Sequence, residues 1–158
     1  MSTHVCSVTW ARRDGEAFVD GRFARRHEWR FDGGAVVAAS ASPHIVPAPY
    51  SVAELLDPEE AFVAALASCH MLFFLHLAAM RQWRVDTYDD HAVGTLTGTA
   101  MPDRWMSVVR LQPLVTFAMS VPDLEEIREV HEEADSLCFL ARSVRTEIVI
   151  DLERQKLP

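Results

Sequence analysis

The sequence contains only three cysteines, Cys6, Cys69 and Cys138, and fewer basic than acidic side chains, 15 against 23. Three thiols are too few for the disulfide framework of a small secreted protein, so they are core residues, metal ligands or redox-active groups. The formal net charge of −8 argues against nucleic acid and anionic membranes as partners, because both bind clustered Lys and Arg. Small molecules are the expected partners.

The first residues also lack a basic segment followed by an apolar one, which is the pattern of an export signal. We therefore expect a cytoplasmic protein. Its 158 residues, 49% hydrophobic and 24% charged, predict a single globular domain over residues 1–158. No internal repeat or low-complexity segment divides the sequence.

The longest apolar run, residues 57–80, predicts the helix around which the fold is organised. Asp57 is suited to cap its first N–H groups, Pro58 suits the first helical position, and Glu60 lies three residues after Asp57. A helix that is apolar on all sides is expected to be buried all round. A run of about 20 apolar residues also has the length of a membrane span, but its two histidines and many alanines favour a core helix.

The remaining segments follow strand and helix patterns in turn. Residues 1–42 and 83–119 contain β-prone stretches with turn signals, and Pro113 is expected to break the second run or mark a sheet edge. Residues 122–141 have apolar positions three and four apart and predict an amphipathic helix. Residues 143–152 alternate as a last strand. Together these segments indicate one α+β domain.

Cys69 and Cys138 fall on the apolar faces of the two predicted helices. The simplest interpretation is that each thiol packs in the core as a small hydrophobic group. Cys69 lies about three turns from the start of its helix, too far for the helix dipole to stabilise a thiolate, and burial favours the protonated thiol. A reactive Cys69 therefore needs a cation from elsewhere in the protein.

Two segments, DPEEAFVAALASCH over residues 57–70 and HEEADSLCFLARSV over residues 131–144, resemble the paired signatures of the OsmC/Ohr family of osmotically inducible and organic hydroperoxide resistance proteins. The resemblance covers most of the chain. It implies an OsmC-like α+β fold, with an antiparallel sheet packed on the long central helix and on the second helix, in an interlocked homodimer. It also implies a thiol-dependent peroxidase for organic hydroperoxides that holds no cofactor and is reduced by an external dithiol, a lipoyl-type dithiol being one candidate.

The resemblance assigns a role to each matching residue. Cys69 corresponds to the peroxidatic cysteine, Cys138 to the resolving cysteine, and Glu59 to the carboxylate that orients an activating arginine. The family's arginine comes from the N-terminal strand region, in a place that differs between subgroups. We favour Arg25, in the segment FARRHEW.

Three other arginines, Arg12, Arg13 and Arg26, stay open as the activating residue, and each also fits a solvated basic turn. Two departures from the family pattern lie near the second cysteine. Asp135 and Arg142 stand where many relatives carry His and Asn. We therefore expect the surroundings of that cysteine to differ from those in the relatives.

The implied chemistry suits these residue types. A thiolate attacks the distal oxygen of the hydroperoxide, releases an alcohol and becomes a sulfenic acid, which a second thiol condenses to a disulfide. An arginine beside Cys69 would stabilise the thiolate and bind the peroxide, and Glu59 would hold that guanidinium. The Phe- and Leu-rich stretch around Cys69 favours an organic substrate over hydrogen peroxide.

Two other functions compete with this one. The first is metal binding by the cysteines and histidines of the two helices, namely Cys69, His70, His76, His131 and Cys138. Their spacing gives no compact ligand set, because Cys69 and His70 are neighbours on a helix and face different ways. The second is a non-catalytic module that binds a hydrophobic small molecule in the same apolar cleft, with inert cysteines.

Helix geometry also bears on assembly. Glu59 and Cys69 are ten residues apart on one predicted helix, so their backbones lie about 15 Å apart along its axis and about 80° apart around it. One arginine can hardly reach both within a chain. If both act in one site, the carboxylate beside a given Cys69 comes from a second subunit, and the sites are shared in a homodimer. The alternative is that Glu59 only favours its own helix N-terminus.

Overall fold

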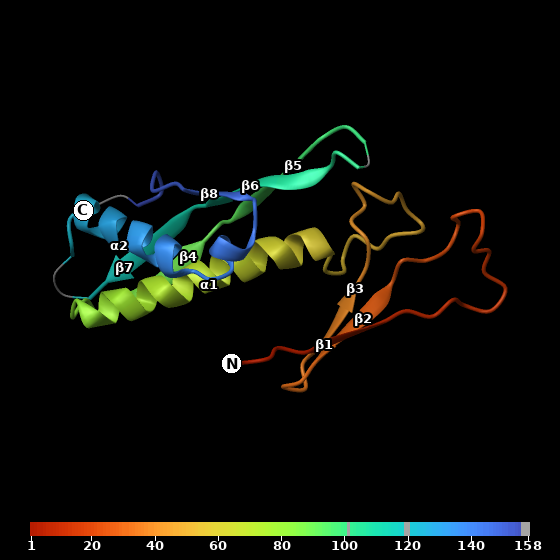
Figure 1. Cartoon of the computed structure of the whole chain (residues 1–158), viewed down its shortest axis with the longest axis horizontal. Coiled ribbons are helices and arrows are strands. Elements are labelled where there is room, and N and C mark those ends of the chain that lie inside the picture. Colours follow the sequence, from red (N-terminus) through yellow and green to blue (C-terminus); the bar gives the residue numbers. More distant parts are fainter. Residues whose placement is uncertain (101, 119–120, 156–158) are drawn as a thin grey trace. The chain divides into compact units, whose positions relative to one another are not determined.

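The computed structural model describes residues 1–100, 102–118 and 121–155 (Figure 1). The chain forms two compact units, residues 1–61 and residues 62–158. The single domain expected from the sequence stays a prediction. The fold class is α+β, as predicted, with helices and strands in both halves of the sequence.

The N-terminal unit is built on a three-stranded antiparallel sheet. Its strands are β1 (Cys6–Thr9), β2 (His27–Phe31) and β3 (Val36–Ala39), and β2 lies in the middle. The chain reverses between β2 and β3 at Gly34, whose φ of 88° is costly for residues with a Cβ. The strands and this turn lie where the sequence of residues 1–42 predicts them.

The long helix α1 (Pro58–Met80) begins as its sequence predicts. The Asp57 carboxylate accepts the Glu60 N–H at 2.7 Å, and the Glu60 carboxylate accepts the Asp57 N–H at 3.1 Å. This reciprocal capping box satisfies two N–H groups that a helix start otherwise leaves unpaired. The neighbouring carboxylate of Glu59 takes no part in this capping box.

Two sheets belong to the second unit, and they contain the predicted strands of residues 83–119. Strands β4 (Val85–Asp90) and β7 (Pro113–Phe117) pair antiparallel, while β5 (Val93–Thr97), β6 (Trp105–Leu111) and β8 (Glu147–Ile150) form the other sheet. The prediction of antiparallel pairing is wrong for β6 and β8, which are parallel. Pro113 separates β6 from β7 as expected, and residue 119 lies outside the described residues.

Helix α2 (Leu124–Leu137) is shorter than the predicted residues 122–141. It starts with a second capping box, between Asp123 and Glu126, and stops because Cys138 takes an extended conformation with a ψ of 103°. A 3₁₀ turn, η1 (Ala141–Ser143), follows. The last strand is likewise shorter than predicted, four residues of the expected 143–152.

Helix α1 contributes to two apolar cores in the second unit. Towards its C-terminal end, Phe74, Leu77 and Ala78 pack with α2 and β7, and further towards its N-terminal end Leu66 packs with β6. Strand β5 comes so close to α1 that a Cβ on Gly94 would lie 2.5 Å from Cγ2 of Val63. The helix is therefore the central packing element of this unit.

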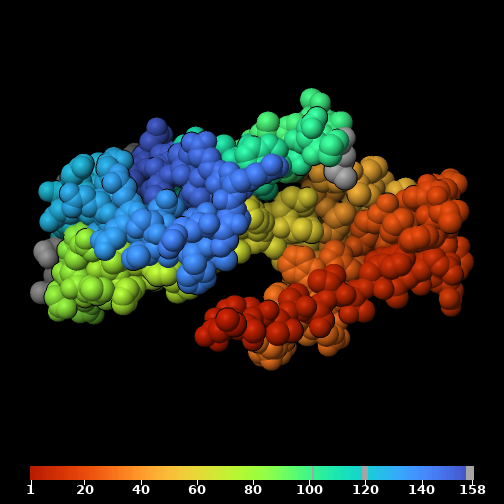
Figure 2. Space-filling model, in the orientation of Figure 1, coloured from red at the N-terminus to blue at the C-terminus, as the bar shows by residue number. Residues whose placement is uncertain are grey.

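The prediction that α1 is buried all round is wrong for the chain by itself. An exposed stripe runs along one side of the helix, at Ala64, Ala65, Ser68, Leu72, His76 and Met80. Leu72 keeps 62% and Met80 66% of its surface exposed. Figure 2 shows the yellow-green end of α1 open to view beside the blue atoms of α2. By length and mean hydropathy, 1.9, the helix also qualifies as a membrane span, a test that core helices of soluble proteins pass too.

Candidate functional site

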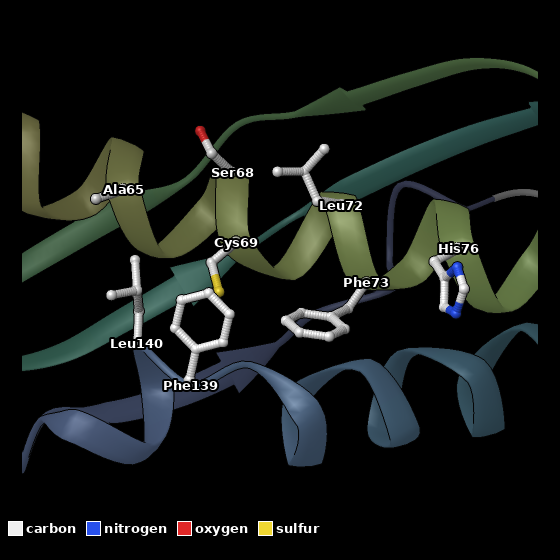
Figure 3. A pocket seen from close by; sticks show the side chains of 8 residues that line it. All are labelled: Ala65, Ser68, Cys69, Leu72, Phe73, His76, Phe139 and Leu140. Carbon is white, nitrogen blue, oxygen red and sulfur yellow. The ribbon is translucent and has the colours of Figure 1, made fainter. Parts of the chain in front are cut away.

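An apolar cavity of about 580 Å³ lies in the second unit between α1 and the turn that follows α2. Its lining is Ala65, Ser68, Cys69, Leu72, Phe73, His76, Phe139 and Leu140. In Figure 3, Cys69, Phe73 and His76 project from α1 towards α2, and Phe139 and Leu140 project from the turn towards α1. The rings of Phe73 and Phe139 meet edge to face at 5.8 Å between centroids. The cavity fits an apolar molecule or alkyl chain, with a sulfur atom in its wall.

The structure brings the two predicted reactive cysteines together. Cys69 and Cys138 are both free thiols, 7% and 1% exposed. Cys69 points from the middle of α1 into the cavity, and Cys138 is the capping residue at the end of α2. The Cys69 side chain is close enough to Cys138 to raise the pKa of the Cys138 thiol. Cys6, the third thiol, is exposed in the N-terminal unit.

The Cys138 thiol is held in its protonated form. Its Sγ accepts the Ala141 N–H at 3.4 Å, which fixes the sulfur at the end of α2. Burial first, and then the hydrogen bond with Cys69, raise the pKa of Cys138 to about 11. At neutral pH this side chain can therefore donate its hydrogen to the Cys69 sulfur.

A pair of buried histidines joins the two helices that position the thiols. Nε2 of His70 and Nδ1 of His131 are 2.9 Å apart, and the two rings stack with centroids at 5.2 Å and an interplanar angle of 3°. Burial lowers the pKa of His70 to about 4, and burial together with the neighbouring ring lowers the pKa of His131 to about 3. Both rings are therefore neutral at physiological pH, with one donating and the other accepting the shared proton.

The two residues that depart from the family pattern differ in burial. Asp135 lies one turn after His131 on α2, half-buried, and burial raises the pKa of its carboxyl group. Its Oδ1 has no hydrogen-bond partner among the described residues. Arg142 is exposed in the turn after α2, where its backbone N–H donates to the Cys138 carbonyl. Neither side chain lines the cavity.

Glu59 and Arg25 belong to the N-terminal unit, and the two cysteines belong to the second unit. Glu59 lies in the first turn of α1, and its Oε2 is buried without a hydrogen-bond partner among the described residues. The guanidinium of Arg25 lies 3.5 Å above the Phe23 ring and donates to the carbonyls of Gly21 and Phe23. Their predicted roles beside Cys69 stay predictions.

The alternative arginines are more exposed than Arg25. Arg12 donates to the carbonyls of Arg13 and Glu16, at 3.3 and 2.7 Å. Arg13 and Arg26 are exposed side chains of the same unit. Half-burial favours Arg25 over these three as a residue with a fixed position.

The candidate metal ligands do not gather. Across residues 1–100, 102–118 and 121–155, no three His, Cys, Asp or Glu side chains are placed to hold an ion. His70 and His131 do meet, but through the direct hydrogen bond between their ring nitrogens. His76 instead lines the cavity, on a different face of α1 from His70.

Sequence reasoning missed three features of the site. Phe139 and Leu140 line the cavity although they follow the helix, and both are exposed enough to contact a ligand. The pairing of His70 with His131 was also missed. The available signal was the position of His131 on the same apolar stripe as Cys138, where a buried imidazole needs a polar partner.

Comparisons with known proteins identify the family of the chain. The family model described as OsmC-like protein matches residues 53–153. An OsmC-like protein of unknown function from Vibrio cholerae has 49% sequence identity and a TM-score of 0.91, over 96% of this chain and 99% of that chain. No curated protein matches the chain.

More distant structures share the fold alone. An organic hydroperoxide resistance protein OsmC from Legionella pneumophila is 15% identical, with a TM-score of 0.69 over 96% of each chain. The organic hydroperoxide resistance protein OhrB of Bacillus subtilis is 15% identical, with a TM-score of 0.65 over 96% of this chain and 98% of that chain. The resemblance carried by the two cysteine segments is confirmed, because the match extends over both: the chain belongs to the OsmC-like protein family.

Proposed function

We propose that the protein is a thiol-dependent peroxidase that reduces organic hydroperoxides to alcohols. One observation carries this proposal: Cys69 and Cys138 are buried free thiols close to each other, and Cys69 lies in the wall of an apolar cavity. Hydroperoxide resistance proteins with the same fold support a role in peroxide resistance. The apolar lining suits an alkyl or aryl hydroperoxide better than hydrogen peroxide, because it offers few polar groups to a small polar ligand.

The two thiols divide the reaction between them. The Cys69 thiolate attacks the distal oxygen, so that the O–O bond breaks and an alkoxide leaves, and Cys69 becomes a sulfenic acid. The alkoxide takes a proton and leaves as the alcohol. Cys138 then attacks the sulfenic sulfur, forming the disulfide and releasing water. An external dithiol restores both thiols by exchange through a mixed disulfide.

Burial of Cys138 keeps the two steps in order. With a pKa of about 11, Cys138 remains a thiol while Cys69 attacks, so it does not compete for the peroxide. Activation of Cys69 needs a cation, and Arg25, held by Glu59, is the proposed source.

Glu59 and Cys69 are carried by one uninterrupted helix, α1, so their axial separation is about 15 Å. We therefore propose an obligate homodimer in which the Glu59 of one subunit serves the Cys69 of the other. The exposed apolar stripe of α1 supports this, since a second subunit can cover Leu72 and Met80. Mixing Glu59→Ala with Cys69→Ser chains tests the shared site. Heterodimers should recover activity in one of their two sites. No recovery of activity, despite proven exchange of subunits, would exclude the shared site.

The activity itself is tested by counting thiols. Reduced protein treated with one equivalent of cumene hydroperoxide should lose two thiols per chain and regain both with a dithiol. Cys6→Ser is the matched control, because Cys6 is exposed and lies in the other unit, and its turnover should equal that of the wild type. Unchanged thiols after treatment would reject the peroxidase.

The second candidate function is a non-catalytic module for a hydrophobic small molecule, favoured by the apolar lining of the cavity. Such a module would bind cumyl alcohol, the unreactive analogue, and leave both thiols intact after hydroperoxide treatment. The same thiol count therefore separates the two functions.

A further inference from the structure

The hydrogen bond between His70 and His131 joins the two helices that carry the thiols. His70 directly follows Cys69 on α1, and His131 lies seven residues before Cys138 on α2. Seven residues are about two turns, so His131 and Cys138 lie on the same face of α2. Both rings are almost fully buried, 1% and 0% exposed. The bond is therefore an internal link between the two helices that carry the sulfurs.

The other contacts between these helices are less directional. Phe74, Leu77 and Ala78 of α1 pack with apolar residues of α2, and apolar contacts tolerate sliding because they depend on buried area. Apart from the two thiols themselves, the other polar side-chain link in the described residues is the exposed ion pair of Arg81 with Glu133, just beyond the end of α1. Exposed pairs contribute little. The imidazole pair is thus the link that restricts the axial register of α1 and α2.

A disulfide depends strongly on that register. Its Cα atoms must lie within about 4.4–6.8 Å of each other, whereas one residue of helix rise is about 1.5 Å. A slip of one or two residues between the helices takes the sulfurs out of bonding range.

Stability alone does not account for the pair. Nδ1 of His70 and Nε2 of His131 are buried without partners among the described residues. Each unpaired buried polar atom costs about 1–3 kcal/mol, and replacing both partners of a buried hydrogen bond by apolar groups is often neutral or stabilising. Two apolar side chains at these positions would therefore stabilise the folded protein more than this pair does.

We propose that His70 and His131 are positioning residues, whose hydrogen bond holds α1 and α2 in the register that lets Cys69 and Cys138 form a disulfide. The pair acts through the helices and does not touch the substrate. The link to peroxide turnover rests on the proposed function, but the positioning effect is a property of the two thiols and is measurable without peroxide.

The test uses the equilibrium with glutathione, in which two protein thiols and one glutathione disulfide give the protein disulfide and two glutathione thiols. The full chain carries Cys6→Ser, so that the exposed thiol does not contribute to the measured exchange with glutathione. The double variant His70→Leu/His131→Phe removes both polar rings, while Phe at position 131 keeps an aromatic ring against Phe74, whose centroid lies 4.2 Å from that of His131. His131→Asn is the conservative variant, since its side-chain amide takes the place of Nδ1 and can either accept from His70 or donate to it. The variant His91→Leu is the control for the loss of an imidazole, because His91 is exposed.

We expect the double variant, verified as folded by urea unfolding, to show an effective concentration of one thiol at the other at least about tenfold below the wild type. Misplacement of reacting groups by about 1 Å can cost up to about 10²-fold. The Asn and His91 variants should keep the wild-type value. Equal values in the wild type and the folded double variant would overturn the proposal. If the double variant does not fold, His131→Phe is compared with His131→Asn, and equal values there overturn it as well. A protein that forms this disulfide with glutathione but consumes no hydroperoxide would refute the peroxidase and leave the positioning role intact.

Discussion

Acidification should destabilise the protein strongly through the His70–His131 pair. In the folded chain burial lowers the pKa of the two rings to about 4 and about 3, against an ordinary value of 6.5. Between pH 6.5 and about 4 the unfolded chain therefore binds protons that the folded chain does not. The free energy of unfolding falls as the pH falls through this window, and the contribution of the pair is fully present only above about pH 6.5.

At pH 5 the folded rings are still neutral, so the effect depends mainly on the ordinary imidazole pKa. The pH of 5 lies about 1.5 units below that value. This difference lowers the free energy of unfolding by about 2 kcal/mol for each ring and by about 4 kcal/mol for the pair. This is a large part of the 5–15 kcal/mol by which domains are usually stable. Burial raises the pKa of Asp90 and Asp135, so these carboxyls act in the opposite direction and must be subtracted.

Urea unfolding at fixed protein concentration, between pH 7.5 and 5.0, measures the effect. The matched control is His70→Leu/His131→Phe, which keeps both aspartates. We expect the difference in unfolding free energy between wild type and control to shift by about 4 kcal/mol across the range. Parallel pH dependences would refute the assignment of a neutral buried pair.

Three further outcomes follow from the same structure. Cys138→Ser should consume one equivalent of hydroperoxide and then stop, with a sulfenic acid trapped by dimedone, and sustained turnover with a dithiol would contradict the resolving role. Arg25→Ala should slow alkylation of the peroxidatic thiol by iodoacetamide at neutral pH, whereas Arg26→Ala should not. Slower alkylation in Arg26→Ala alone would assign the activating role to Arg26. Gly94→Ala should lower the unfolding free energy by about 1–3 kcal/mol, because the new Cβ meets Val63; an unchanged urea midpoint would contradict the close approach of β5 to α1.

Local signals in the sequence predicted the starts of elements well. Asp57, Pro58 and Glu60 predict the start of α1, and the observed capping box uses the expected side chains. These interactions span three residues and hardly depend on the rest of the fold. The two cysteine segments also identified the family, which the match over residues 53–153 confirms.

Ends and pairings depended on distant contacts and were predicted less well. The second helix was predicted to extend to residue 141, but Cys138 leaves the helix, its sulfur held by the Ala141 N–H. The parallel pairing of β8 with β6 joins segments far apart in sequence, and no local pattern specifies it. An all-apolar helix likewise does not reveal which of its faces its own chain covers, and in α1 the stripe at Leu72 stays exposed.

The site was predictable only in part for the same reason. Periodicity placed Cys69 and Cys138 on apolar helix faces, and the family resemblance paired them. Neither source gave the contact of His70 with His131, because helix period fixes the direction of a side chain but not its partner across the interface. That contact follows from the packing of α1 on α2.

Mapping the disulfide after a single oxidation tests the central claim most directly. Reduced wild-type protein is treated with one equivalent of cumene hydroperoxide, blocked with iodoacetamide, digested without reduction and analysed by mass spectrometry. The account predicts a cross-link between Cys69 and Cys138 within one chain, with Cys6 alkylated. Alkylated Cys69 and Cys138, or a cross-link through Cys6, would contradict it.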